Sequence, residues 1–338
     1  MVLESIWFFL WGLLWAVYFM TDGFDLGIGS LLPFLGKTEE DKRVMVNAMG
    51  PLWDGNQVWL LSAGGVTFAA FPRVYAVMFS SLYSALMLIL FALILRGVAF
   101  EFRGKVQSPA WRRLWDACIF VGSAAPALLF GVAFANIFQG IPIDQKGIFQ
   151  GNLFTLLNPY GIVGGVLFVM LFLVHGALWL AIKSEGALRE RAAATAGRLW
   201  PIEVGVAVVF LGLGIFTTRL YDNYLAHPLL FAVILLTVAA LFGIRVFLAK
   251  GALFTAWVSS AVTIVGATFY GVIGLFPNMF PSSLDAAYSL TAHNSASSQL
   301  TLTIMLIVVA IFVPIVLAYQ AWAYRLFNTP VRTEDLIY

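Results

Sequence analysis

Apolar stretches of about 20 residues, nearly free of charged side chains, recur along the 338 residues of this chain. A helix needs about 20 consecutive apolar residues to cross the hydrocarbon core of a bilayer. The sequence therefore predicts an all-α integral membrane protein, a polytopic bundle of about nine transmembrane helices forming one domain over residues 1–338. The predicted spans are roughly 5–34, 53–71, 74–100, 115–138, 160–183, 201–220, 228–249, 254–276 and 300–326.

The overall composition supports the same fold class. Apolar residues make up 61% of the chain and charged residues 11%, against about 45–50% and about 25% in soluble domains. A soluble fold has no way to hide that much apolar surface from water, whereas lipid removes the difficulty. The net charge of +2 is too small for a nucleic-acid footprint. The single cysteine, Cys118, excludes an internal disulfide and a cysteine-based metal site.

Basic residues gather in alternate loops between the predicted spans. Lysine and arginine mark the cytoplasmic loops of membrane proteins, and here they follow the first, third, fifth, seventh and ninth spans. This asymmetry predicts an outside N-terminus and a cytoplasmic C-terminus. The segment 53–71 is the weakest span, because it is short and carries Asp54, Asn56 and Gln57. A re-entrant or interfacial segment stays open for it, since the later basic loops face inward either way.

Acidic residues near the first two predicted spans are candidate functional groups, because a charge at the bilayer centre costs about 2.5–3.5 kcal/mol on insertion scales. Asp22 and Asp25 are three residues apart and share a helix face. Asp54 follows a Gly50-Pro51 break and falls in a first helical turn, where the helix dipole stabilises a carboxylate; Gln57 shares its stripe. The alternative for Asp22 and Asp25 is a helix end hydrated among the lipid headgroups. The alternative for Asp54 is an acid that only caps its helix.

Arg96 and Glu101 lie at the end of the third predicted span. Arginine stays charged in proteins, so a buried Arg96 needs a carboxylate partner, and we predict Asp25, Asp54 or Glu101. Snorkelling to the interface is the competing explanation. In the predicted topology all these charges fall in the cytoplasmic half. That arrangement predicts a proton path from the cytoplasm with Asp25, Asp54, Gln57 and Glu101 as its groups and Arg96 as their charge partner.

Histidines are too few for haem ligation by this chain. Of His175, His227 and His293, only His175 lies well inside a predicted span, and bis-histidine ligation needs two that face each other. No metal-binding or phosphate-binding motif appears in the sequence. We therefore expect no cofactor-binding, metal-binding or catalytic residue on this chain alone.

Several segments resemble one family, subunit II of the cytochrome bd quinol oxidases, and together they extend over essentially the whole chain. The matching segments are 22–27, 50–59, 71–76, 95–103, 158–161, 276–277 with 292–294, and 319–322. The resemblance implies a partner, subunit I, that carries b-type and d-type haems and the quinol site in the bacterial cytoplasmic (inner) membrane. A small single-helix accessory subunit is a further partner that the resemblance allows.

The resemblance also implies an activity. The complex would oxidise quinol and reduce dioxygen to water, generating a proton gradient without pumping, while this chain supports assembly and a proton path. The matching motifs imply that the functionally important positions of the family correspond here to Asp25, Trp53, Asp54 and Arg96. They also imply that Trp53 and Trp59 face the partner haems or an apolar oxygen path.

Two other functions stay open from the residues alone. A secondary transporter could bind substrate or a coupling ion through Asp25, Asp54 and Arg96 at the Gly50-Pro51 break. Against it, no inverted repeat is visible, and the polar residues lie toward one membrane face. The second alternative is a scaffold subunit of the oxidase, whose acids only cap helices. It differs from the first interpretation only in that this chain has no proton role.

Overall fold

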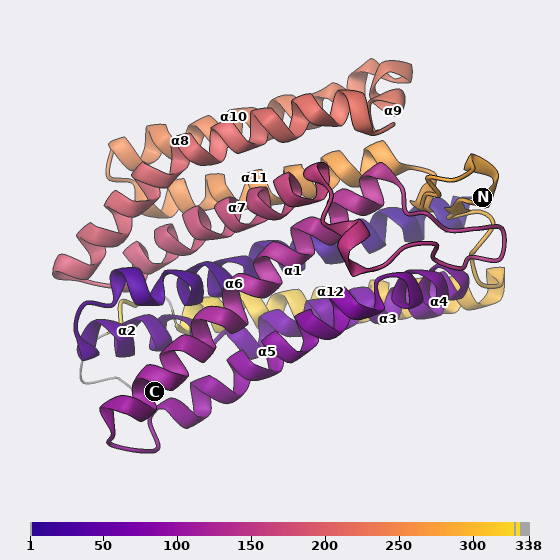
Figure 1. Ribbon diagram of the computed structural model, residues 1–338. Helices are drawn as coiled ribbons and strands as arrows, with labels where there is room; N and C mark the ends of the chain where they lie inside the picture. Colours follow the sequence, from indigo (N-terminus) through magenta and orange to yellow (C-terminus); the bar gives the residue numbers. More distant parts are fainter. Residues whose placement is uncertain (1, 328, 332–338) are drawn as a thin grey trace.

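The structure, a computed structural model, describes residues 2–327 and 329–331. Long helices lie side by side in one elongated bundle (Figure 1). Helix α2 lies at one end of this bundle, called the α2 end below. The N-terminus, α9 and the two short strands lie at the opposite end, called the β end.

The described residues form the following elements. The α-helices are α1 Val2–Leu35, α2 Glu39–Met49, α3 Trp53–Ala70, α4 Pro72–Ser81, α5 Tyr83–Arg103, α6 Pro109–Gln139, α7 Pro159–Lys183, α8 Gly186–Thr217, α9 Tyr221–Ala226, α10 Phe231–Ala249, α11 Leu253–Leu275 and α12 Gln299–Leu326. The 3-10 helices are η1 Leu153–Leu156, η2 Pro228–Leu230 and η3 Ala286–Tyr288. The strands β1 Asn278–Phe280 and β2 Leu290–Thr291 pair antiparallel.

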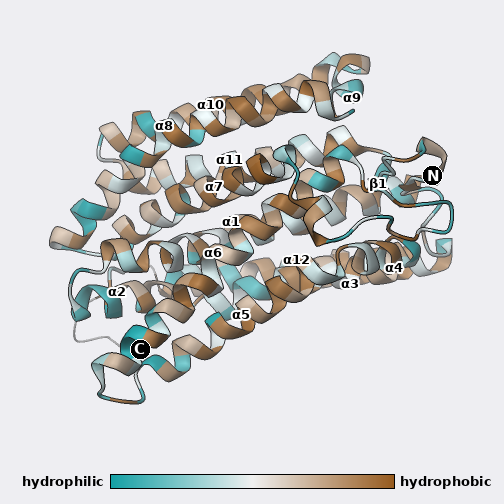
Figure 2. Cartoon of the chain, in the orientation of Figure 1, coloured by the Kyte–Doolittle hydropathy of each residue, from teal (hydrophilic) through white to brown (hydrophobic). Residues whose placement is uncertain are grey.

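The prediction of an all-α membrane protein is confirmed. Within the described residues, eight helices are long and apolar enough to cross a membrane: α1, α5, α6, α7, α8, α10 with η2, α11 and α12. Their apolar middles and polar ends are visible in Figure 2. The segment 53–71 forms α3, which is not among the eight because its first turns carry polar residues. At 1.5 Å per residue its 18 residues extend about 27 Å along α1.

The predicted third span, 74–100, departs from a regular helix at Leu82, where φ is −97° and ψ is 13°. The structure therefore divides it into α4 and α5. The hydrogen bonds from Leu82 N to Met78 O and from Leu86 N to Leu82 O persist across the break, so the deviation is local. No proline or glycine marks this position, and the nearby serines, Ser80, Ser81 and Ser84, are compatible with a continuous helix, so the sequence does not locate the deviation.

Helix α1 lies at the centre of the bundle and packs against α3, α6, α7 and α11. Its closest neighbour is α7, because two glycines bring the backbones into contact. A Cβ atom on Gly27 would collide with the carbonyl oxygen of Phe172, and one on Gly176 would lie 2.7 Å from Ile28 N. Small residues allow such close approach between membrane helices. The contact fixes the rotation of α1, and with it the direction of its acidic side chains.

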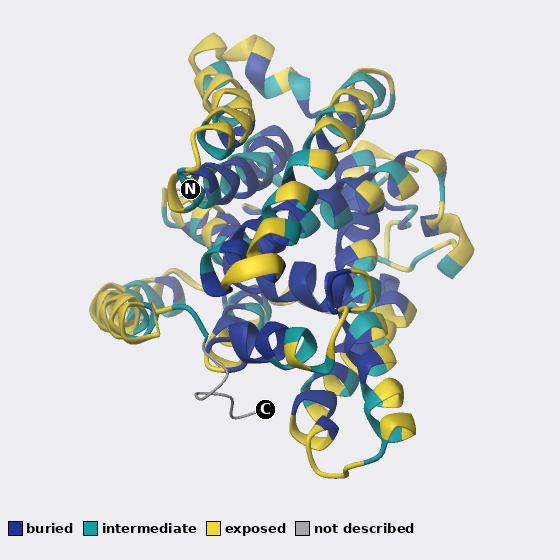
Figure 3. Cartoon of the chain, turned by 90° about the vertical axis from the view of Figure 1, so that its left-hand side faces the viewer, coloured by how far each residue is buried: buried dark blue, intermediate teal, exposed yellow. Residues whose placement is uncertain are grey.

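Helix α12 stands apart from the bundle. Among its residues only Leu302 is buried, and Figure 3 shows the exposed helix leading to the C-terminus set off to one side. Hydrogen bonds tether both of its ends. Trp7 Nε1 donates to Leu302 O at 3.0 Å near the β end, and Trp59 Nε1 donates to Gln320 Oε1 at 3.0 Å toward the α2 end.

Candidate functional site

Two acids and one arginine are buried together beside α1. Asp22 and Asp25 on α1 and Arg96 on α5 are each 0% exposed. Arg96 Nη2 donates to Asp22 Oδ1 at 2.6 Å. Removing charged groups from water costs several kcal/mol per ion unless each charge is paired. The Asp22–Arg96 pair meets that requirement, and it leaves Asp25 as a second carboxyl beside it.

The partner of Arg96 is Asp22, so the prediction of Asp25, Asp54 or Glu101 as its ion-pair partner was wrong. Asp54 and Glu101 are exposed in this chain. The choice between Asp22 and Asp25 depends on how far α1 is rotated toward α5. The packing of Gly27 on α7 sets that rotation, and the sequence of α1 alone does not show it.

Asp25 instead receives a hydrogen bond from a neutral amide. Asn56 Nδ2 on α3 donates to Asp25 Oδ2 at 2.8 Å and to Thr21 O at 3.1 Å. Tyr324 on α12 donates its hydroxyl to Asn56 Oδ1 at 2.9 Å. A hydrogen-bond chain therefore runs from α12 through α3 to the acid on α1. Sequence reasoning noted Asn56 only as a polar residue in a weak span, and it gave no signal for Tyr324.

Further polar atoms in this cluster lack a protein partner among the described residues. They are Tyr18 Oη, Asp22 Oδ2, Asp25 Oδ1, and Nε and Nη1 of Arg96. Most buried polar groups in proteins are hydrogen-bonded, and buried water satisfies those that the protein leaves unpaired. Tyr18 lies one helical turn before Asp22, so these atoms share one side of α1. The cluster has the chemistry to hold water next to two carboxyl groups.

The remaining predicted path residues lie at the start of α3 and the end of α5. Asp54 is exposed and Gln57 is half-buried, with Nε2 unpaired. Glu101 is exposed. The structure thus brings together Asp25 and Arg96, but it places Asp54, Gln57 and Glu101 outside the buried cluster, toward the α2 end.

The two predicted tryptophans differ in their surroundings. Trp53 is half-buried and packs on Phe100 of α5, with ring centroids 5.4 Å apart. Trp59 is 5% exposed and donates to Gln320 of α12. Trp53 therefore joins the start of α3 to the end of α5, and Trp59 joins α3 to α12.

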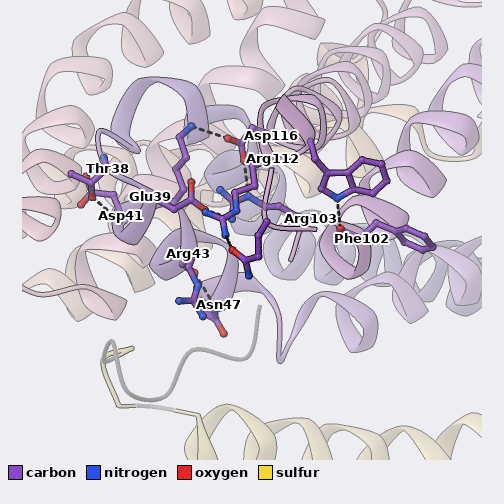
Figure 4. A network of polar contacts seen from close by, with 12 residues as sticks. Thr38, Glu39, Asp41, Arg43, Asn47, Phe102, Arg103, Arg112 and Asp116 are labelled. Carbon is purple, nitrogen blue, oxygen red and sulfur yellow. Dashed lines mark hydrogen bonds and ion pairs between the residues drawn. The ribbon is translucent and has the colours of Figure 1, made fainter. Parts of the chain in front are cut away.

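An ion-pair network at the α2 end fixes the helices that surround the cluster (Figure 4). Arg103 at the end of α5 pairs with Asp116 on α6 at 2.6 Å and with Glu39 on α2 at 2.9 Å. Lys42 on α2 also reaches Asp116, at 2.7 Å. The network ties α2, α5 and α6 together, and α5 is the helix that carries Arg96.

Asp41 on α2 is held by a separate set of contacts. Its Oδ2 accepts hydrogen bonds from Thr38 N at 3.0 Å and from Arg191 Nη2 at 2.7 Å. Burial acts to raise the pKa of Asp41, but the Thr38 and Arg191 hydrogen bonds outweigh burial and lower the pKa below its ordinary value. The carboxylate therefore links α2 to α8 in its charged form.

The described part of the chain holds no group of three or more histidine, cysteine, aspartate or glutamate side chains arranged for a metal ion. His175 is 0% exposed, and both its ring nitrogens already lie within hydrogen-bond distance of protein atoms. Nδ1 is 2.6 Å from Ser260 Oγ, and Nε2 is 3.0 Å from Met20 O. A haem iron could coordinate His175 only after one of these contacts broke.

Comparison with known proteins identifies the family. Residues 3–327 match the sequence profile of cytochrome bd terminal oxidase subunit II. This chain belongs to that family. The match confirms the resemblance found in the sequence, and it removes the basis for the secondary-transporter alternative.

Curated relatives and a solved structure agree with this assignment. The chain is 39% identical to the probable cytochrome oxidase subunit 2 of Haemophilus influenzae, over 95% of this chain and 93% of the relative. It is 37% identical to the cytochrome bd-I ubiquinol oxidase subunit 2 of Escherichia coli K12, over 99% and 97%. It is 35% identical to the cytochrome bd ubiquinol oxidase subunit 2 of Bacillus subtilis, over 98% of each. The bd oxidase structure from Geobacillus thermodenitrificans shares the fold, with a TM-score of 0.79 at 16% identity over 97% of this chain and 99% of that one.

Membership in the cytochrome bd family has direct consequences. The chain is a subunit of an oxidoreductase complex, and such a complex implies a partner, subunit I. It is a multi-pass protein of the bacterial inner membrane.

Proposed function

We propose that this chain completes a quinol:oxygen oxidoreductase by supporting a haem-carrying subunit I and by conducting protons toward it. Subunit I would hold the b-type and d-type haems and bind quinol, and dioxygen would be reduced to water. The family assignment supports the reaction. The observation that carries the proton role is the fully buried Asp25, reached by a hydrogen-bond chain from α12.

The proposed direction of proton transfer is supported by the basic residues at the α2 end. Arg103, Lys42 and Arg191 all form ion pairs in that region, and basic loops mark the cytoplasmic side. The α2 end would therefore face the cytoplasm. Protons taken up there and used for water formation would build a gradient without pumping.

The proposed entrance of the proton path is formed by Asp54, Gln57 and Glu101. Trp53 packs on Phe100, and Asp54 and Glu101 directly follow these two aromatic residues in the chain. The exposed carboxyl groups therefore leave the bundle at neighbouring points of the α2 end. From there Gln57 and Asn56 share the first turns of α3 and lead inward.

The buried cluster suits the inner part of the path. Asp22 is held by the fixed positive charge of Arg96, whereas Asp25 has a neutral amide as its hydrogen-bond donor. The two carboxyl groups therefore differ in their donors, since Asp22 has a cationic partner and Asp25 a neutral one, and Asp25 is the group to which we assign proton exchange. The unpaired atoms around them provide sites for connecting water.

The test uses the complex purified from native membranes through a tag on this chain. Its reduced-minus-oxidised spectrum should show haem b and haem d bands that travel with a second apolar polypeptide. A haem-free preparation would refute the oxidase assignment.

The proton role is tested with Asp25→Asn. We expect intact haem bands and a fall in quinol oxidase turnover of roughly 10²-fold, since removing a proton-transfer group typically costs roughly 10²–10⁴-fold. Asp222→Asn, the same change at an exposed residue of α9 near the β end, is the control and should leave turnover unchanged. Wild-type turnover in Asp25→Asn would remove this acid from the path.

A further inference from the structure

We propose that Tyr324 is a positioning residue for Asp25. Its hydroxyl holds the Asn56 amide against the Asp25 carboxyl group, and proton transfer at Asp25 therefore depends on the position of α12 relative to α3. This inference rests on the proposed proton role of Asp25. It assigns a function to Tyr324 and Asn56, which the motif comparison did not single out.

The argument begins with the amide of Asn56, which is 1% exposed. A side-chain amide donates through nitrogen and accepts through oxygen. Here Nδ2 serves two acceptors, Asp25 Oδ2 and Thr21 O, while Oδ1 receives the hydroxyl of Tyr324. All three contacts are compatible only with this orientation of the amide. Without Tyr324, Oδ1 would be a buried acceptor with no donor, and the amide could lower its free energy by turning away from Asp25.

The ring of Tyr324 is itself held in place by aromatic neighbours. It meets Phe24 edge-on, with centroids 6.3 Å apart at 88°, and Trp179 at 6.0 Å and 62°. Both neighbours belong to the central helices α1 and α7. The hydroxyl therefore keeps its direction toward Asn56 as long as α12 stays where it is.

Helix α12 depends on few contacts at this end. Gln320 and Tyr324 both hydrogen-bond to α3, but their hydrogen-bond chains lead to different residues. Gln320 accepts from Trp59 Nε1 and donates to Gly55 O at 3.3 Å, and neither contact reaches α1. Tyr324 is the α12 residue whose hydrogen-bond chain ends at Asp25. Because α12 is otherwise almost unburied, a small displacement of this helix would break the chain.

The titratable groups around Asp25 come from several elements. They are Tyr18 and Asp22 on α1, Arg96 on α5, Tyr324 on α12 and, beyond Met20, His175 on α7. Of these, Tyr324 is the group that reaches Asp25 through Asn56. Replacing Tyr324 by phenylalanine leaves the others in place and removes one oxygen atom.

The experiment compares Tyr324→Phe with Tyr319→Phe in the purified complex. Tyr319 lies on the same helix, is 63% exposed and is the matched loss of a hydroxyl. We expect Tyr324→Phe to retain the haem spectrum, to lower quinol oxidase turnover by about 2- to 10-fold, and to displace its pH profile toward alkaline values, since the lost hydrogen bonding favoured the charged carboxylate. Tyr319→Phe should match the wild type in all three.

A double-mutant cycle separates positioning from general loosening. In an Asn56→Ser background, Tyr324→Phe should cause little further loss, because both changes interrupt the same chain. Gln320→Met removes the hydrogen bonds of α12 to Trp59 and Gly55 O but keeps the Tyr324 hydroxyl and the ring contacts with Phe24 and Trp179 that hold it toward Asn56, so this variant should keep the wild-type pH profile. Additive losses, or a wild-type pH profile in Tyr324→Phe, would overturn the proposal.

Two outcomes keep this proposal distinct from the proposed function. If Asp25→Asn is fully active, the proton role itself fails. If Asp25→Asn is inactive while Tyr324→Phe keeps the wild-type profile, only the positioning role fails. Should Tyr324→Phe not assemble, Asn56→Ser alone decides the matter: it leaves the ring of Tyr324 in its aromatic contacts, and a wild-type pH profile in that variant would refute the inference.

Discussion

Removing Arg96 should destabilise this subunit more than removing any exposed basic residue. The guanidinium is 0% exposed and pairs at 2.6 Å with Asp22, which is also 0% exposed. The variant Arg96→Met keeps most of the side-chain volume and removes the positive charge. It leaves the Asp22 carboxylate buried without its compensating partner.

The expected magnitude follows from this burial. Removing one partner of a buried ion pair costs about 3–5 kcal/mol. At roughly 2 °C per kcal/mol, the low end for larger chains, the thermal unfolding midpoint should fall by about 6–10 °C. Replacing both partners by neutral residues removes the uncompensated charge as well. The double variant Arg96→Met with Asp22→Asn should therefore recover at least half of the loss.

Thermal unfolding of the purified complex, followed by tryptophan fluorescence, measures the effect. Arg113→Met is the matched control, because Arg113 is exposed at the start of α6. A midpoint in Arg96→Met equal to that of Arg113→Met would show that the pair does not stabilise the fold. A double variant as unstable as Arg96→Met alone would show that the loss comes from packing and not from the unpaired carboxylate.

Two further predictions concern acids outside the cluster. Glu203 on α8 is 1% exposed beside a cavity of about 90 Å³, and its Oε2 has no hydrogen-bond partner in the described residues. Because an unpaired buried polar group costs about 1–3 kcal/mol in proteins, Glu203→Met should raise the thermal unfolding midpoint. A lower midpoint would show that the Glu203 carboxyl group has a stabilising partner. Asp41 has a lowered pKa, so its bonds to Thr38 and Arg191 stabilise the fold fully above the ordinary value of 3.8 and lose that effect as pH falls through the lower native pKa. Asp41→Asn should thus lower the midpoint at neutral pH and have a smaller effect in acid, and an equal effect at both would contradict the assignment.

The sequence predicted the spans and the buried charges for different physical reasons. Long apolar runs reveal membrane helices because the hydrophobic thickness of the bilayer sets their length. Asp25 and Arg96 stood out because charges are costly in lipid. The start of α8 at Gly186, well before the predicted 201, was missed because its first turns carry charges and extend beyond the apolar run. Likewise, Tyr324 was overlooked because a tyrosine near a helix end is typical of interfacial anchoring.

The ion pair that was assigned to the wrong acid can be derived once one helix contact is known. Gly27 faces the backbone of α7, and Asp25, two residues earlier, lies about 160° away around the helix axis, because each residue turns α1 by about 100°. Asp25 therefore points away from α7 toward α3, where Asn56 donates to it. Asp22 lies about 60° from Asp25, which directs it to α5 and Arg96. Two acids on one face of one helix thus acquire different partners, one charged and one neutral, and the proposed proton role of Asp25 rests on that difference.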